Sequence, residues 1–110
     1  VLIDKKYKEK SCEYKVIKEH EDTHVYLNRQ VLTEFAPRIK QKVNEVAASI
    51  PPRVEYTKVR AEKALSEMLA KVQDAVKPDM AEFRILQDER NQAIDTKENY
   101  RATTNMCDRW

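Results

Sequence analysis

The sequence contains no glycine among its 110 residues. Tight β-hairpin turns and phosphate-binding loops depend on glycine, because it tolerates positive φ and allows close backbone approach. Its absence therefore excludes a Walker phosphate loop and a dinucleotide-binding fingerprint, which are both defined by glycines. The high charged fraction, 36% of residues, favours long helices with solvated faces instead.

Clustered charge of one sign is also missing. The 21 lysines and arginines are interspersed with 19 aspartates and glutamates, so the net charge is only +2. The one basic cluster, Lys5 to Lys10, is short and is interpreted as a solvated loop. A nucleic-acid-binding surface needs a larger basic patch, so nucleic acid is not expected as a partner. No apolar run approaches the length of a membrane-spanning helix.

Cysteine is scarce, and its two residues, Cys12 and Cys107, lie near opposite ends of the chain. In a cytosolic protein both would be free thiols, whereas in an exported protein they would form a disulfide. Such a bond would close a loop of about 94 residues and, on the chain-entropy model, stabilise the fold by about 4–5 kcal/mol. The sequence alone leaves both redox states open.

Two long segments carry apolar residues at helical spacing. The first covers residues 12–50, with Ser11 as its N-cap, and the second covers residues 54–94. The pair Pro51-Pro52 separates them and marks a turn. Because the segments have similar lengths and a short connection, we predict a mainly α fold built on an antiparallel hairpin of long helices.

Smaller features add detail to this hairpin. Pro37 should kink or break the first helix and Pro78 the second, because proline removes a helical hydrogen bond. Residues 1–3, Val-Leu-Ile, are interpreted as a short strand remnant. Residues 95–98 have the form of a capping box with Asp95 as the cap, and they start a C-terminal helical segment. We expect residues 1–110 to form a single helical domain, the C-terminal part of a larger one.

Both histidines of the chain fall in one motif, His20-Glu21-Asp22-Thr23-His24, which fits the H-E-x-x-H pattern of zinc peptidases. On a helix, His20 and His24 project from one face, one turn apart, and can bind one cation. Glu21 lies about 100° further round the helix, where it can take a proton from a water activated by zinc. The alternative is a pair of hydrogen-bonded histidines on a half-buried helix face without a metal.

The motif contains only two of the three protein ligands that a catalytic zinc needs, and no histidine remains to supply the third, which must be a carboxylate, a tyrosine or a residue outside this chain. The hairpin geometry places Asp79 and Glu82 of the second helix opposite the motif. A disulfide between the two cysteines would instead fold the C-terminal segment back toward the motif. This segment supplies a second group of candidates, Asp95, Glu98 and Tyr100. For each of these residues, the alternative is an ordinary solvated or capping role.

Together these features resemble a bacterial family known as predicted secreted zinc-dependent proteases. In that family a helix carries HExxH, a second long helix follows, and an Asp-containing segment ends in Trp. The corresponding pieces here are the HEDTH motif, residues 54–94 and residues 95–110. The resemblance covers residues 11–110. It implies a zinc-dependent metallopeptidase that acts on peptides or proteins in the periplasm or outside the cell, with a signal peptide that is absent from this chain.

The chain also departs from the family pattern. The family has a Thr and then a His-Gly shortly after the Asp, where this chain has Glu98, Tyr100 and Arg101. If that His is a ligand in the family, Glu98 or Tyr100 takes its place here, and we favour Glu98. The family also has strands before the motif helix, beside which zincin-type enzymes bind substrate; only residues 1–3 remain here. Two other functions stay open, a non-enzymatic helical-hairpin interaction module and an inactive metal-binding relative.

Overall fold

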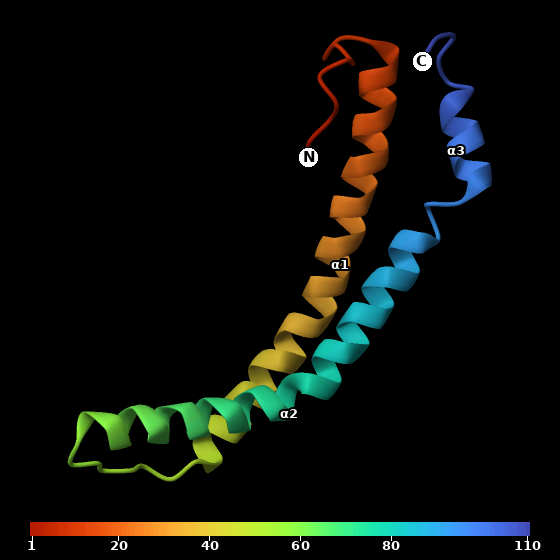
Figure 1. Cartoon of the computed structure of the whole chain (residues 1–110). Coiled ribbons are helices and arrows are strands. Elements are labelled where there is room, and N and C mark those ends of the chain that lie inside the picture. Colours follow the sequence, from red (N-terminus) through yellow and green to blue (C-terminus); the bar gives the residue numbers. More distant parts are fainter. The chain divides into compact units, whose positions relative to one another are not determined.

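The computed structural model describes residues 1–110 and contains three helices and no strand (Figure 1). Helix α1 spans Cys12–Ser49, α2 spans Lys58–Gln92 and α3 spans Lys97–Thr104. The predicted mainly α class, with two long helices and a C-terminal helical segment, is therefore confirmed. None of the helices combines the length and the apolar character that a membrane crossing requires.

Polar side chains cap the two long helices, whose first backbone N–H groups have no partner within the helix. The hydroxyl of Ser11 accepts a hydrogen bond from the N–H of Tyr14 at 3.1 Å, so the predicted cap of α1 is confirmed. The hydroxyl of Thr57 accepts from the N–H of Arg60 at 3.2 Å. Helix α2 therefore starts at Lys58, a few residues later than the apolar spacing indicates.

The cap of α3 corrects the sequence-based prediction. The side chain of Thr96 accepts from the N–H of Asn99 at 3.1 Å, so Thr96 is the N-cap and Asp95 is not. Both residue types are good caps, and the choice between them depends on where the helix starts. Because Asp95 does not cap α3, its carboxylate is available for contacts elsewhere.

One further prediction is wrong: residues 1–3 form no strand, because no second strand lies beside them to complete the hydrogen bonding. Pro37 and Pro78 do not break their helices, since α1 and α2 continue through them, whereas a kink at either proline stays a prediction. Each proline costs one helical hydrogen bond. Tertiary packing offsets this loss beside Pro37, where the buried Phe35 packs against Phe83.

The chain divides into two compact units. Unit 1 consists of Val1–Val31 and Ile85–Trp110, and unit 2 consists of Leu32–Arg84. Both long helices pass from one unit into the other. Each unit therefore contains one segment of α1 packed antiparallel to one segment of α2.

Unit 2 is held together by an aromatic contact and an ion-pair cluster. The rings of Phe35 and Phe83 meet edge to face, with their centroids 5.7 Å apart. Arg38 lies 4.8 Å from the centroid of the Phe35 ring and donates hydrogen bonds to Asp79 at 2.6 Å and to Glu82 at 2.8 Å. Two of the carboxylates considered as zinc ligands thus bind an arginine of unit 2.

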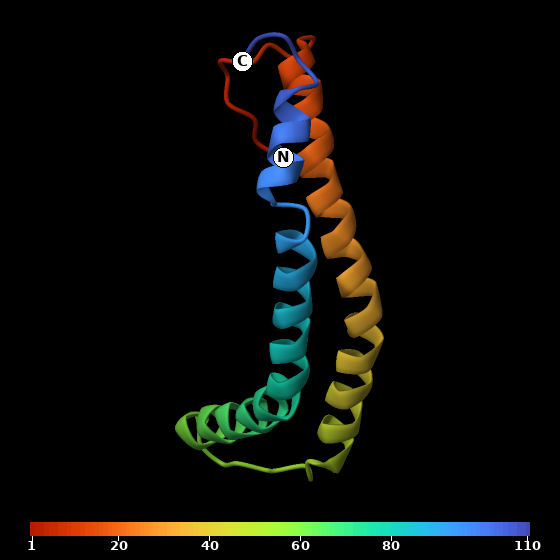
Figure 2. The same cartoon turned by 90° about the vertical axis from the view of Figure 1, so that its right-hand side faces the viewer.

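Unit 1 is closed by a disulfide between Cys12 and Cys107, as expected for an exported protein. The bond joins the first residue of α1 to the segment that follows α3, and both chain ends lie near the first turns of α1 (Figure 2). Disulfides form and persist in oxidising compartments, so the bond fits such a location. Val31 and Cys107 are the only buried apolar side chains of this unit, so the cross-link supplements a small core.

Replacement of both cysteines, Cys12→Ser with Cys107→Ser, is expected to lower the free energy of unfolding by about 2–5 kcal/mol, because the unfolded chain regains the entropy of a long open loop. Urea unfolding followed by circular dichroism measures this change. Reductant should lower the stability of the wild type to that of the variant and leave the variant unchanged. Equal stability of the oxidised wild type and the variant would contradict the prediction.

Candidate metal centre

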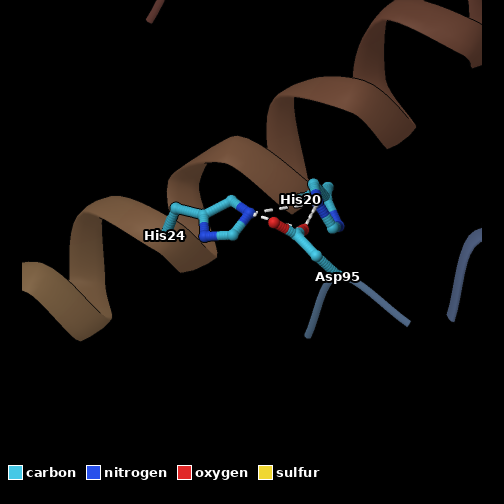
Figure 3. A group of neighbouring side chains, drawn as sticks. All are labelled: His20, His24 and Asp95. Atoms are coloured by element: carbon cyan, nitrogen blue, oxygen red, sulfur yellow. Dashed lines mark hydrogen bonds and ion pairs between the residues drawn. The ribbon is translucent and has the colours of Figure 1, made fainter. Parts of the chain in front are cut away.

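His20 and His24 lie one turn apart on α1, and their imidazoles converge (Figure 3). The ring centroids are 4.9 Å apart, and the two Nε2 atoms are 3.2 Å apart. Each side chain is only 17% exposed. Both histidines therefore face the protein from the same side of the helix, as the spacing of four residues predicts.

A third atom of ligand type comes from Asp95, in the turn between α2 and α3. Its Oδ1 lies 3.0 Å from Nε2 of His20 and 2.9 Å from Nε2 of His24 (Figure 3). The three atoms form a nearly equilateral triangle, and the three residues form a group that could hold a metal ion. The Asp95 side chain is 37% exposed, so one side of the group is open to solvent.

The local backbone explains how Asp95 reaches the histidines. Helix α2 ends at Gln92, and a turn follows in which the N–H of Ile94 donates to the carbonyl of Asn91 and the N–H of Asp95 donates to that of Gln92. Thr96 then starts α3. Asp95 is thus held in a short connection between two helices, with its carboxylate directed at α1 (Figure 3).

Of the two other candidates that lie close in sequence, Tyr100 contacts the group. Its ring packs against His20 with the centroids 5.6 Å apart. Burial and the neighbouring Asp95 raise the pKa of the Tyr100 hydroxyl. Glu98 lies in the first turn of α3, is exposed, and is not a member of the group. Its role as third ligand stays a prediction, whereas Asp95 is the carboxylate that the structure brings to the histidines.

The acidic residues inside the motif differ in their surroundings. Glu21 is half-buried, and its charge acts on both His24 and Tyr100. Asp22 is half exposed and forms an ion pair with Lys18 one turn earlier. The charge of Asp22 is therefore compensated by Lys18, while the charge of Glu21 acts on His24, a member of the candidate metal-binding group.

The hydrogen bonds of this group favour the charged forms of His24 and Asp95. Burial opposes a charge on His24, but hydrogen bonds with Asn91 and Asp95 outweigh it, so the pKa of His24 lies above 6.5. Burial likewise opposes a charge on Asp95, but hydrogen bonds with His24 and then His20 outweigh it, so the pKa of Asp95 lies below 3.8. In the imidazolium form of His24, Nδ1 donates to Asn91 and Nε2 donates to Asp95.

A metal ion fits in the place of that proton. In a tetrahedral zinc site with metal–nitrogen distances of about 2.0–2.1 Å, neighbouring ligand atoms lie about 3.3 Å apart. The observed separations of 2.9, 3.0 and 3.2 Å are slightly shorter, as expected for atoms joined by hydrogen bonds. Two imidazole nitrogens and one carboxylate oxygen form a donor set that suits a small divalent cation such as zinc.

The fold and the site define a class: a helical protein with one disulfide and a candidate metal centre made of His20, His24 and Asp95. Comparisons with protein-family models, with curated proteins and with solved structures found no match to the chain. Its function therefore has to be inferred from the chemistry of the site.

Sequence reasoning missed one residue of the site, Asn91. It lies on α2 four residues after Gln87, and its side-chain oxygen accepts a hydrogen bond from Nδ1 of His24. Asparagine belongs to no metal-binding motif, so residue type gives no signal. The available signal is position, because Gln87 and Asn91 are half-buried polar residues on the inward side of α2.

The ionisation of His24 and Asp95 should make the stability of the metal-free protein depend on pH in two separate pH ranges. Because the pKa of His24 is raised, its stabilising contribution is present below pH 6.5 and is lost as the pH rises through the folded-state pKa. Because the pKa of Asp95 is lowered, its contribution is present above pH 3.8 and is lost as the pH falls. Thermal unfolding in chelator should therefore show the largest contribution between these two values.

The variant Asp95→Asn removes the Asp95 titration and that part of the His24 effect that comes from Asp95, so its melting temperature should vary less with pH than that of the wild type. Asp108→Asn makes the same change at an exposed aspartate outside the group and should keep the wild-type profile. Parallel profiles for the wild type and Asp95→Asn would show that the Asp95 charge contributes no pH dependence.

Proposed function

We propose that the chain is a zinc-dependent peptidase in which His20, His24 and Asp95 hold the metal and Glu21 is the general base. The observation that carries this proposal is the convergence of two imidazole Nε2 atoms and one carboxylate oxygen, all within 3.2 Å of one another. Three protein ligands and a side open to solvent are typical of catalytic zinc sites, whereas structural sites use four protein ligands.

A bound zinc ion would supply Lewis acidity, which polarises a peptide carbonyl and lowers the pKa of water to about 7. The proton transfers fall to Glu21, which can take a proton from the attacking water and pass it to the leaving amine. Glu21 directly follows His20 and is not a member of the ligand group. Its charge acts on His24 and Tyr100, which supports its assignment as the base.

Asp95 and Tyr100 complete the site. The carboxylate of Asp95 supplies one negative charge to a divalent cation that the two neutral imidazoles cannot supply. Tyr100 packs against His20 and interacts electrostatically with that carboxylate, so it supports two of the three proposed ligands. The disulfide supports the further proposal that the protein acts in the periplasm or is secreted.

A second candidate function, partner binding without catalysis, is favoured by the surface of unit 2. Val54, Tyr56 and Val59 are 79%, 89% and 76% exposed, which is high for apolar side chains in one short stretch. None of them belongs to the metal-binding group. This function and the peptidase function differ in their dependence on zinc, which the following measurement tests.

Protein purified without chelator should contain one zinc ion per chain by mass spectrometric metal analysis. His20→Ala, His24→Ala and Asp95→Ala should each abolish tight binding, because two remaining ligands hold zinc weakly. Glu98→Ala should leave binding intact, and the opposite result would make Glu98 the third ligand. A wild type that contains no zinc and binds none on titration at neutral pH would refute the proposal and leave partner binding as the function.

The variant Glu21→Gln should keep zinc and lose the base, so turnover of a fluorogenic peptide library should fall by about 10²-fold or more. Glu19→Gln makes the same change at an exposed neighbour and should keep wild-type turnover. Zinc-loaded wild-type protein that cleaves no peptide would refute peptidase activity and favour an inactive metal-binding relative. Unchanged turnover in Glu21→Gln would refute the role of Glu21 alone.

A further inference from the structure

The half-buried polar side chains between α1 and α2 in unit 1 form a network that the proposed chemistry does not use. Nδ2 of Asn91 donates hydrogen bonds to Oδ1 of Asn28 and to the backbone carbonyl of Gln87, each at 2.7 Å. Nε2 of Gln87 donates to the same Asn28 oxygen at 3.2 Å. These two acceptors around Nδ2 define which end of the Asn91 amide is nitrogen and which is oxygen.

The oxygen of this amide faces His24. Oδ1 of Asn91 lies 2.5 Å from Nδ1 of His24. An amide oxygen can only accept, so Nδ1 carries a hydrogen in both the charged and the neutral imidazole. When His24 becomes neutral, it therefore loses the proton from Nε2, the nitrogen that lies beside His20 and Asp95.

We propose that Asn91 is a positioning residue that fixes the tautomer of His24, so that Nδ1 stays protonated and Nε2 presents its lone pair to the metal. This inference rests on the proposed zinc binding. In the absence of Asn91, the acceptor that remains beside the ring is Oδ1 of Asp95, 2.9 Å from Nε2. Neutral His24 would then keep its hydrogen on Nε2, and this hydrogen would block the metal-binding position.

An amide suits this role better than a carboxylate would. A carboxylate would also accept from Nδ1, but it would add a second negative charge next to His24 and favour the imidazolium over the neutral ring. Protons would then compete more strongly with a metal for Nε2. Asn91 selects the tautomer without adding a charge, and its bonds to Asn28 and Gln87 hold it in place.

Long-range ¹⁵N–¹H NMR of the metal-free protein at about pH 9, where histidine is neutral, identifies the protonated ring nitrogen. His24 should carry its hydrogen on Nδ1 in the wild type and on Nε2 in Asn91→Leu. Asn91→Asp keeps an acceptor oxygen and should restore the Nδ1 form. Asn44→Leu makes the leucine change at an exposed asparagine of α1 in unit 2 and should match the wild type.

Zinc affinity, measured by competition with a chelating dye, provides the second readout. Asn91→Leu should bind zinc about 10–100-fold more weakly than the wild type, and Asn91→Asp should recover most of this loss. If Asn91→Leu does not fold, Asn91→Ser takes its place, because it cannot reach His24 with an amide oxygen. The wild-type tautomer needs no variant and is decisive by itself.

A wild-type His24 with its hydrogen on Nε2 would overturn the inference, and so would an unchanged tautomer in Asn91→Leu. Equal zinc affinity of the wild type and Asn91→Leu, with the tautomer changed, would overturn the positioning role. If the tautomers behave as expected but wild-type protein binds no zinc, the proposed function fails and the control of the His24 tautomer by Asn91 stands.

Discussion

The disulfide between Cys12 and Cys107 is the constraint on which unit 1 depends, because hydrophobic burial is scarce in this chain. The buried apolar side chains are only four in number: Val31, Phe35, Ala64 and Cys107. Such a small core offsets little of the conformational entropy that folding removes. The cross-link reduces that entropy in the unfolded state, and it keeps the segment after α2 close to α1. The meeting of Asp95 with the two histidines follows from this closure.

The candidate metal centre shows how a half-buried group of titratable residues is stabilised in more than one state. With a proton on Nε2 of His24, hydrogen bonds to Asn91 and Asp95 satisfy both ring nitrogens. A bound metal would replace the hydrogens shared among Nε2 of His20, Nε2 of His24 and Oδ1 of Asp95, and Asn91 would keep its bond to Nδ1 of His24. Because these atoms already converge, binding would require little rearrangement of the side chains around them.

Features governed by local rules could be predicted from the sequence. Apolar spacing predicts both long helices, Pro51-Pro52 predicts the break between them, and helix geometry alone directs His20 and His24 to one side. The role of Asp95 depends on the exact residue at which α3 starts. Asp95 and Thr96 are both good caps, and a shift of one residue in the start of α3 decides which of them is free to reach the histidines. Propensity and motif do not resolve a shift of this size.

Features that depend on residues far apart in the sequence could not be predicted from it. Residues 1–3 have strand propensity, but a strand also needs a neighbour, and the chain provides none. Asn91 has no distinctive type or spacing, and only the packing of α2 against α1 shows that its oxygen faces His24. The disulfide follows from the cysteine count once the protein is taken to be exported, because an oxidising compartment leaves few thiols unpaired.

The position of the disulfide also changes the path by which the metal-binding group assembles during folding. Asp95 and His24 are 71 residues apart along the backbone. Through the sulfur–sulfur bond the path is much shorter, because His24 lies twelve positions after Cys12, and Cys107 lies twelve positions after Asp95. Loop-closure entropy grows with the logarithm of loop length, so this shortcut lowers the cost of bringing the two side chains together by about 1 kcal/mol. Once the disulfide has formed, the meeting of Asp95 with His24 is therefore a nearly local event along the cross-linked chain.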